Sequence, residues 1–196
     1  MNGIVELIKK NEQLFLENAE ELNDEELEQE DLDEYLALQG VTEEELNAFE
    51  NQFQIRLPED FKTVYRYKNG SGYMNLIWPQ TGFYRGYRLL SLQEMSEIKS
   101  YFQSENHEMT EFPDVIDEKQ LQQLDERIKP YLFCERWFPF AECAGSLYLM
   151  LDYEPNEKGK IGQIICYVHD PDFIYYIAPN ITETLKLTET VIEDLI

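Results

Sequence analysis

The sequence predicts an α+β fold: an antiparallel sheet of about five to six strands with helices packed on one face, preceded by an acidic helical extension. Two observations lead to this prediction. Capped segments with apolar residues at helical spacing lie in both the N-terminal and C-terminal parts of the chain. Between them lie short runs of nearly alternating apolar residues, separated by turn residues every eight to twelve positions or so. The expected order is helices, strands, a helical insertion, strands and a final helix.

The first 40 residues are expected to form the extension. Residues 2–18 carry a loose helical apolar pattern, and residues 20–34 are acidic and low in complexity. We expect a solvated helix pair or a semi-ordered arm that ends at Gly40. Because the segment has few large apolar side chains, its deletion should leave the rest of the chain folded. The sequence thus divides into an extension, 1–40, and an α+β domain, 41–196, with a helical insertion near 91–130.

Two short helices open the predicted domain. Thr42 and Glu45 have the spacing of a capping box, which begins the first helix. Pro58 is expected at the first position of the second helix, and Asn69-Gly70 should end it. The apolar positions of these helices predict one buried face: Leu46, Phe49 and Phe53 on the first, and Phe61, Val64 and Tyr65 on the second.

The remaining elements follow from alternation and caps. Strands are predicted within residues 73–78, 87–92, 131–143, 146–155, 161–170 and 173–178. Ser91 and Asp117 should begin the two helices of the insertion, whose apolar faces include Met95, Ile98 and Phe102 on the first and Leu121, Leu124 and Ile128 on the second. Asn180 should begin the C-terminal helix.

The net charge of −24 is concentrated near the start of the chain. Residues 1–50 contain 17 acidic residues and two lysines, which leaves −15. This charge disfavours binding to nucleic acid or to an anionic membrane, because both require Lys and Arg. It favours a basic partner instead, although a charged surface also keeps an ordinary protein soluble. Both explanations remain open from composition alone.

No arrangement of residues predicts catalysis, a metal site or a cofactor. Cys134, Cys143 and Cys166 are expected to be buried free thiols of a reducing cytosol. His169 lies in an HDPD sequence that is typical of a turn after a strand. No apolar run is long enough to span a bilayer, and the first residues do not resemble a secretory leader. We therefore expect a cytoplasmic, non-enzymatic protein without cofactor.

The run TEEELNAFENQFQIRLPEDFKTVYRYKNG at 42–70, followed by WFPFAECAGSLYLMLDYEP and GKIGQII, resembles the SUKH superfamily over residues 41–196. The acidic segment before residue 40 is additional to that pattern, and the loop at 142–146 lacks its usual Gly-Asp step. The resemblance implies an antiparallel sheet with flanking helices. Bacterial members are mostly immunity proteins that bind a toxin, which implies binding and neutralisation of a cognate toxin, here a basic protein such as a nuclease. The alternative is a scaffold or regulatory module, like the SMI/KNR-type cell-wall assembly regulators.

Five residues are the candidates for contact with such a partner. Trp and Tyr often dominate binding energies, and strand-end carboxylates would suit a basic surface. The candidates are Trp78, Trp137, Asp152, Tyr153 and Glu154. For the two tryptophans, ordinary packing within the core or sheet remains the alternative explanation.

Overall fold

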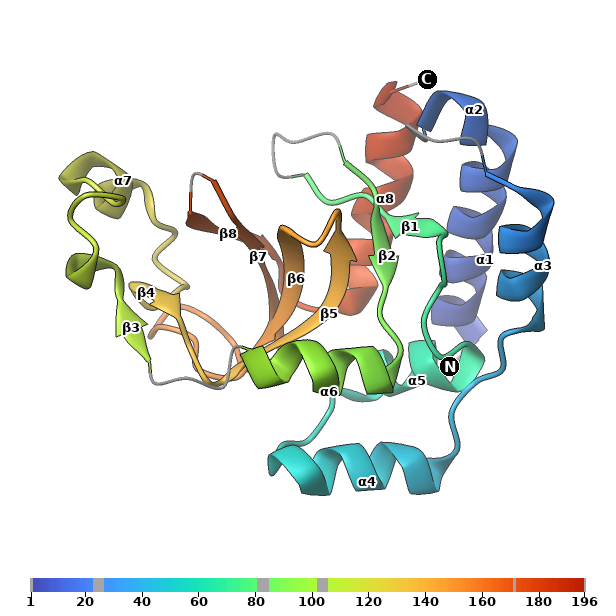
Figure 1. Cartoon of the computed structure of the whole chain (residues 1–196), viewed down its shortest axis with the longest axis horizontal. Helices are drawn as coiled ribbons and strands as arrows, with labels where there is room; N and C mark the ends of the chain where they lie inside the picture. The colour runs from blue at the N-terminus through green and yellow to red at the C-terminus, as the bar shows by residue number, and fades with distance from the viewer. Residues whose placement is uncertain (1, 23–26, 81–84, 102–105, 171, 196) are drawn as a thin grey trace.

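The computed structural model describes residues 2–22, 27–80, 85–101, 106–170 and 172–195 of the 196-residue chain (Figure 1). Its helices are α1 (Asn2–Glu17), α2 (Ala19–Leu22), α3 (Gln29–Ala37), α4 (Glu43–Phe53), α5 (Glu59–Tyr67), α6 (Leu92–Tyr101), α7 (Glu118–Gln123) and α8 (Ile181–Leu195), with a 3-10 turn, η1, at Met109–Glu111. Its strands are β1 (Asn75–Ile77), β2 (Tyr87–Leu89), β3 (His107–Glu108), β4 (Tyr131–Phe133), β5 (Trp137–Cys143), β6 (Leu147–Asp152), β7 (Gln163–Val168) and β8 (Phe173–Ala178).

The predicted α+β class is confirmed. Six strands form one curled antiparallel sheet in the order β1-β2-β5-β6-β7-β8, and β3 pairs with β4 in a separate two-stranded sheet. The long strands β5, β6 and β7 follow one another through short connections, as expected for a meander. The inserted segment between β2 and β5 is therefore only partly helical, because it contributes β3 and β4 as well as α6, η1 and α7.

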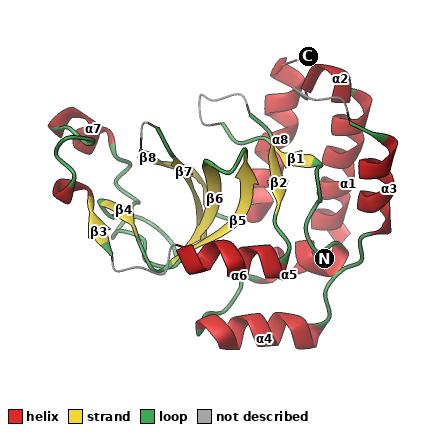
Figure 2. Ribbon diagram, viewed as in Figure 1, coloured by secondary structure: helices red, strands yellow, loops and turns green. Residues whose placement is uncertain are grey.

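Side-chain alternation along β7 divides the interior into two parts. Ile164, Cys166 and Val168 point into a core shared with α1, α4, α5, α6 and α8. Ile165 and Tyr167 point the other way, into a second core closed by the inserted segment around η1 and β4. Figure 2 shows β3, β4 and α7 of the inserted segment at the end of the molecule far from α1 and α3. Phe102, an expected core residue of the insertion, lies outside the described residues.

The α4–α5 corner forms much as the sequence predicts. The backbone N–H of Thr42 donates to Glu45 Oε2 over 2.7 Å, and the N–H of Glu45 donates to Thr42 Oγ1 over 3.2 Å, which completes the capping box. Pro58 caps α5 from the position before it, one residue earlier than expected. Gly70 takes a left-handed φ of 90° after the helix has ended.

Helix α1 is packed into the molecule, which differs from the solvated arm expected from composition. Ile8 and Phe15 are buried, and the side-chain N–H of Asn11 donates to the Leu185 carbonyl of α8 over 3.2 Å. Figure 1 shows α1 and α8 side by side. The sparse apolar positions of α1 lie on one helical face, so a few large side chains suffice to anchor it. Whether residues 1–40 form a separable unit stays a prediction.

Candidate functional site

Four of the five predicted contact residues lie together where β5 begins and β6 ends. Trp137 faces Asp152 across the β5–β6 pairing, and Tyr153 and Glu154 follow directly. Trp78 lies apart from them, packed against Val191 and Ile192 of α8. Both tryptophans are buried, which favours the packing explanation for their presence. The assignment of all five residues to partner binding stays a prediction.

The buried carboxylate of Asp152 holds the end of β6 in place through hydrogen bonds. Its Oδ1 accepts the Trp137 indole N–H over 3.1 Å and the Glu154 backbone N–H over 2.8 Å, while Oδ2 accepts the Gln163 amide N–H over 2.9 Å. Burial raises the pKa of Asp152 to about 6, although these hydrogen bonds act in the opposite direction. The carboxylate therefore fixes the direction in which the chain leaves β6.

Tyr153 connects that strand end to the helical corner. Its hydroxyl donates to the Arg56 carbonyl over 2.9 Å, in the segment between α4 and α5. Its ring packs edge-on against Phe138 with centroids 5.4 Å apart. The Arg136 guanidinium carbon lies 5.9 Å from the Tyr153 ring centroid. The half-buried tyrosine is thus held from three directions.

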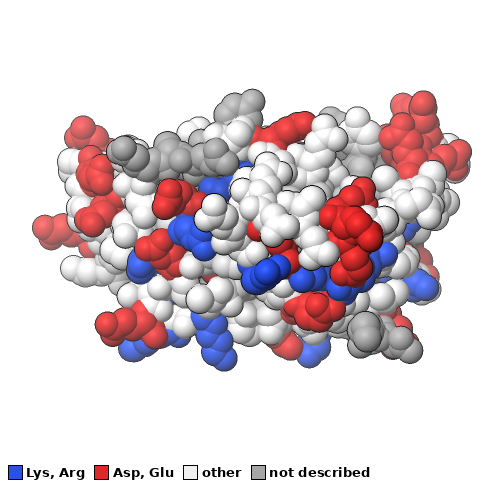
Figure 3. All heavy atoms as spheres, turned by 90° about the horizontal axis from the view of Figure 1, so that it is seen from below, with Lys and Arg blue, Asp and Glu red and all other residues white. Residues whose placement is uncertain are grey.

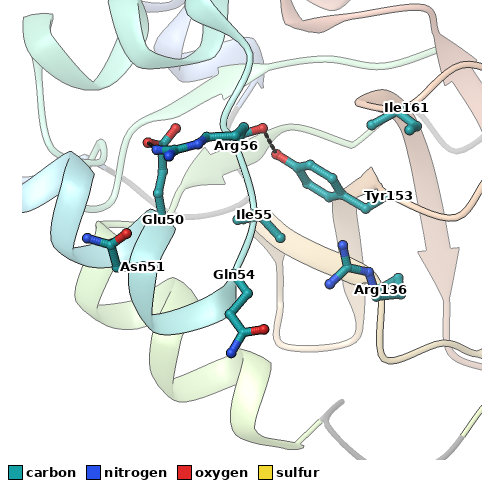
Figure 4. A pocket seen from close by; sticks show the side chains of 8 residues that line it. All are labelled: Glu50, Asn51, Gln54, Ile55, Arg56, Arg136, Tyr153 and Ile161. Atoms are coloured by element: carbon teal, nitrogen blue, oxygen red, sulfur yellow. Dashed lines mark hydrogen bonds and ion pairs between the residues drawn. The ribbon is translucent and has the colours of Figure 1, made fainter.

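A hollow of about 410 Å³ lies beside Tyr153 (Figure 4). One wall is the end of α4 and the following segment, with Gln54 and Arg56, and the opposite wall is Tyr153 and Arg136. Ile161, from the β6–β7 connection, forms part of the rim and is 72% exposed. The hollow is thus lined mainly by polar side chains, with one exposed apolar side chain at its rim.

Glu50 stabilises the helical wall of this hollow. Its buried carboxylate accepts the Leu57 N–H over 2.8 Å and pairs with Lys62 at 2.8 Å and Arg56 at 2.9 Å. Burial alone would raise the pKa of Glu50, but the hydrogen bonds from Lys62, Leu57 and Arg56 lower it overall. The positive charge of Arg56 is thereby balanced within the protein.

A second hollow of about 330 Å³ adjoins the first and shares Gln54 and Arg136 with it. Lys99 lies in its lining, where the ammonium donates to the Glu135 carbonyl over 2.7 Å and lies 4.9 Å from the Phe138 ring centroid. Burial lowers the pKa of Lys99 to about 8. The lining of this second hollow therefore brings two basic side chains, Lys99 and Arg136, together with one acidic side chain, Glu135.

Acidic and apolar side chains are exposed together around α3. Asp33 and Glu34 are exposed on this helix, and Leu36 is 61% exposed beside them. Tyr73 is also exposed, at 65%. Its neighbour in the chain, Met74, packs with Tyr35 of α3. On the face shown in Figure 3, Lys and Arg side chains lie among Asp and Glu and form no uniform basic surface. Such a face suits a protein partner better than a phosphate backbone.

No group of three or more His, Cys, Asp or Glu side chains among the described residues could hold a metal ion. His169 pairs with Asp172 at 2.9 Å in an exposed turn, as its sequence predicts. None of the described helices is long and apolar enough to cross a bilayer.

Sequence reasoning missed Arg56, Arg136 and Ile161. Arg136 lies in the tight connection between β4 and β5, and Ile161 lies in the hairpin after β6, so neither belongs to a recognisable motif. They meet only because the sheet register brings the two connections to the same end of the molecule. An exposed isoleucine in a hairpin was the only local signal.

A comparison with curated proteins gives no match. The model of the SMI1/KNR4 family (SUKH-1) matches residues 40–187. The match begins where the capped helix α4 follows the acidic segment, and it spans the whole six-stranded sheet. It therefore covers both walls of the hollow beside Tyr153. The chain belongs to the SMI1/KNR4 (SUKH-1) family.

Proposed function

We propose that this chain is a non-enzymatic immunity protein of the cytoplasm that binds and neutralises a cognate protein toxin with a basic surface, such as a nuclease domain. Membership of the SUKH-1 family supports a binding role. The observation that carries the choice of partner is the net charge of −24, with 17 acidic residues among the first 50. A field of this sign accelerates encounter with a basic protein.

The arrangement of the surface supports inhibition by occlusion. A nuclease needs its Lys and Arg side chains to hold the phosphate backbone. Exposed carboxylates of α3 and α4, including Asp33, Glu34 and Glu44, offer those cations an alternative partner. The hollow beside Tyr153 offers a defined place for a protruding side chain. Together they would cover the toxin's substrate-binding surface without any chemical reaction.

Co-expression tests the proposal directly. The toxin domain to use is the one encoded beside this gene, expressed in cells with and without the chain. We expect growth to be restored by the wild-type chain and to follow the strength of direct binding measured with purified proteins. Phe61→Ala is a useful control, because loss of the buried ring should reduce protection only by reducing the amount of folded protein. Failure of the soluble wild-type chain to protect would contradict the proposal.

The alternative is a scaffold or regulatory module, a role supported by the regulator relatives that give the family its name. The same experiment separates the two functions. An immunity protein protects cells and lowers the toxin's activity in vitro, whereas a scaffold binds its partner and leaves that partner's activity unchanged.

A further inference from the structure

The side chain of Arg136 differs from other arginines in this acidic chain. The protein has 40 acidic residues for 16 Lys and Arg, so a carboxylate partner is easily found. Carboxylates lie within 4 Å of several arginines: Arg56 pairs with Glu50, Arg66 with Glu43 and Glu59, Arg88 with Glu94 and Glu142, and Arg127 with Asp125. In the part of the chain that the structure describes, no carboxylate pairs with the Arg136 guanidinium.

The position of Arg136 is fixed by its surroundings. Its backbone N–H lies 3.4 Å from Cys134 Sγ, and its carbonyl accepts the Tyr153 N–H over 3.0 Å. The guanidinium carbon lies 5.9 Å from the Tyr153 ring centroid, and the side chain is half-buried. In Figure 4 the guanidinium points into the hollow, towards Gln54 and Ile55. The backbone of Arg136 is therefore fixed, and the guanidinium lies on the Tyr153 side of the hollow, where it can receive an anion.

We propose that this hollow is a receptor for a single carboxylate side chain, an Asp or Glu presented by the partner protein, with Arg136 as its anchor. The inference rests on the proposed function. Two parallel N–H···O bonds from the guanidinium would hold the carboxylate. The amide of Gln54 lines the same space, and the exposed Ile161 packs beside the inserted stem. Arg56 contributes less, since Glu50 already balances its charge.

The net charge explains why the anion comes from a protein and not from solution. A chain of charge −24 repels small anions, so the local attraction of Arg136 is opposed at long range. A carboxylate carried on a basic protein does not meet this repulsion, because the surrounding surface is attracted as a whole. The acidic surface attracts any basic protein, and the receptor selects one that places a carboxylate opposite Arg136. Specificity then arises from one contact in which the acidic protein supplies the cation and the basic partner supplies the anion.

The receptor can be tested on the full chain without the toxin. The side-chain Nε–Hε signals of arginine are followed by NMR, with Arg136→Lys identifying the Arg136 signal by its loss. The α-N-methylamide of N-acetylglutamate, whose single carboxylate is that of the side chain, is the probe, and the α-N-methylamide of N-acetylglutamine is the uncharged control. With enough salt to screen the long-range repulsion of the acidic chain, we expect the Arg136 signal to shift progressively with the glutamate amide. The Arg56 signal should stay unchanged, and the glutamine amide should shift neither signal. No shift at Arg136, or equal shifts with both compounds, overturns the proposal.

A charge reversal tests the receptor in the complex with the toxin domain. We expect Arg136→Glu to weaken binding by about 30-fold or more, because two carboxylates would then face each other. Lys119→Glu changes the net charge equally at an exposed position of α7, and should weaken binding by no more than about threefold. Matching thermal melts of the two variants show that both are folded.

The outcomes separate this inference from the proposed function. If the toxin binds and Arg136→Glu binds as tightly as Lys119→Glu, the receptor is overturned and the immunity function stands. If the toxin does not bind at all but the glutamate amide shifts the Arg136 signal, the carboxylate receptor stands and the immunity function fails.

Discussion

The indole N–H of Trp137 donates to Oδ1 of Asp152 over 3.1 Å, and both side chains are buried. The two residues face each other in the β5–β6 register. An ionisable group in such a place affects stability whenever its pKa differs between the folded and unfolded chain. The hydrogen bond thus links the pH response of the protein to the strand end from which Tyr153 reaches the hollow.

The stability difference between the wild type and Asp152→Asn should depend on pH. Burial raises the pKa of Asp152 from its ordinary 3.8 to about 6, so protonation favours the folded state. The stabilisation of the folded state by protonated Asp152 is fully present below pH 3.8 or so and is lost as pH rises through about 6. Its full size is about 3 kcal/mol. Urea denaturation of both proteins from pH 4 to 7 should show the wild type losing stability relative to Asp152→Asn.

Taking the difference between two proteins is necessary because the chain has 40 acidic residues. Their shared repulsion changes over the same pH range and cancels between wild type and variant. A difference that stays constant from pH 4 to 7 would show that Asp152 has the same proton affinity in both states, and would contradict the prediction.

Local rules were sufficient for the capped helix starts and the long strands, but not for this site or for the end of α7, which was expected to include Leu124 and Ile128 and ends at Gln123. Thr42 with Glu45, and Ser91 with Glu94, form capping boxes because the interaction spans only three residues. Four of the predicted contact residues are close in space for a similar reason, since β5 and β6 are neighbouring strands of one hairpin. Arg136 is distinguished by having no paired carboxylate among the described residues, a property that depends on the fold and that the sequence cannot show.

The N-terminal helix marks another limit of sequence reasoning. Composition led us to expect a solvated arm, because acidic residues outnumber large apolar ones there. Burial depends on whether the few apolar side chains share a face, and Ile8 and Phe15 do. The charged positions of α1 simply occupy the opposite side. Net charge is therefore a poor guide to whether a segment is packed.

Neighbouring residues of α1 should respond very differently to truncation of the side chain. Phe15 is fully buried against Tyr35 and Met74, so Phe15→Ala should lower the free energy of unfolding by about 3–5 kcal/mol. Leu16 is 39% exposed, and Leu16→Ala should change it by less than about 1 kcal/mol. Urea denaturation measures both. Equal, small effects would support the prediction that residues 1–40 are a dispensable arm.

Phe61 and Glu59 in the α4–α5 corner form a second pair of positions whose truncation should have very different effects on stability. Phe61 is fully buried, with its ring centroid 4.8 Å from Tyr65 and 5.4 Å from Phe140. Phe61→Ala should cost about 3–5 kcal/mol through lost burial and the remaining cavity. Glu59→Ala removes an exposed ion pair with Arg66 and should cost less than about 1 kcal/mol. A Phe61→Ala protein as stable as the wild type but unable to bind would assign this corner to the binding site instead of the scaffold.

Association with the basic toxin domain should slow strongly as salt is added. The Debye length falls from about 10 Å at 0.1 M to about 3 Å at 1 M, which removes long-range attraction but leaves close contacts largely intact. Stopped-flow measurement should therefore show a falling association rate with a smaller change in dissociation. Neutralising the exposed α3 carboxylates with Glu30→Gln, Asp33→Asn and Glu34→Gln should reduce the salt dependence, since these residues lie in the most acidic part of the chain. Arg136→Lys, which keeps the net charge, should leave that dependence unchanged and act on dissociation instead. An association rate that is constant between 0.1 and 1 M salt would remove electrostatic attraction as the reason for the acidic composition.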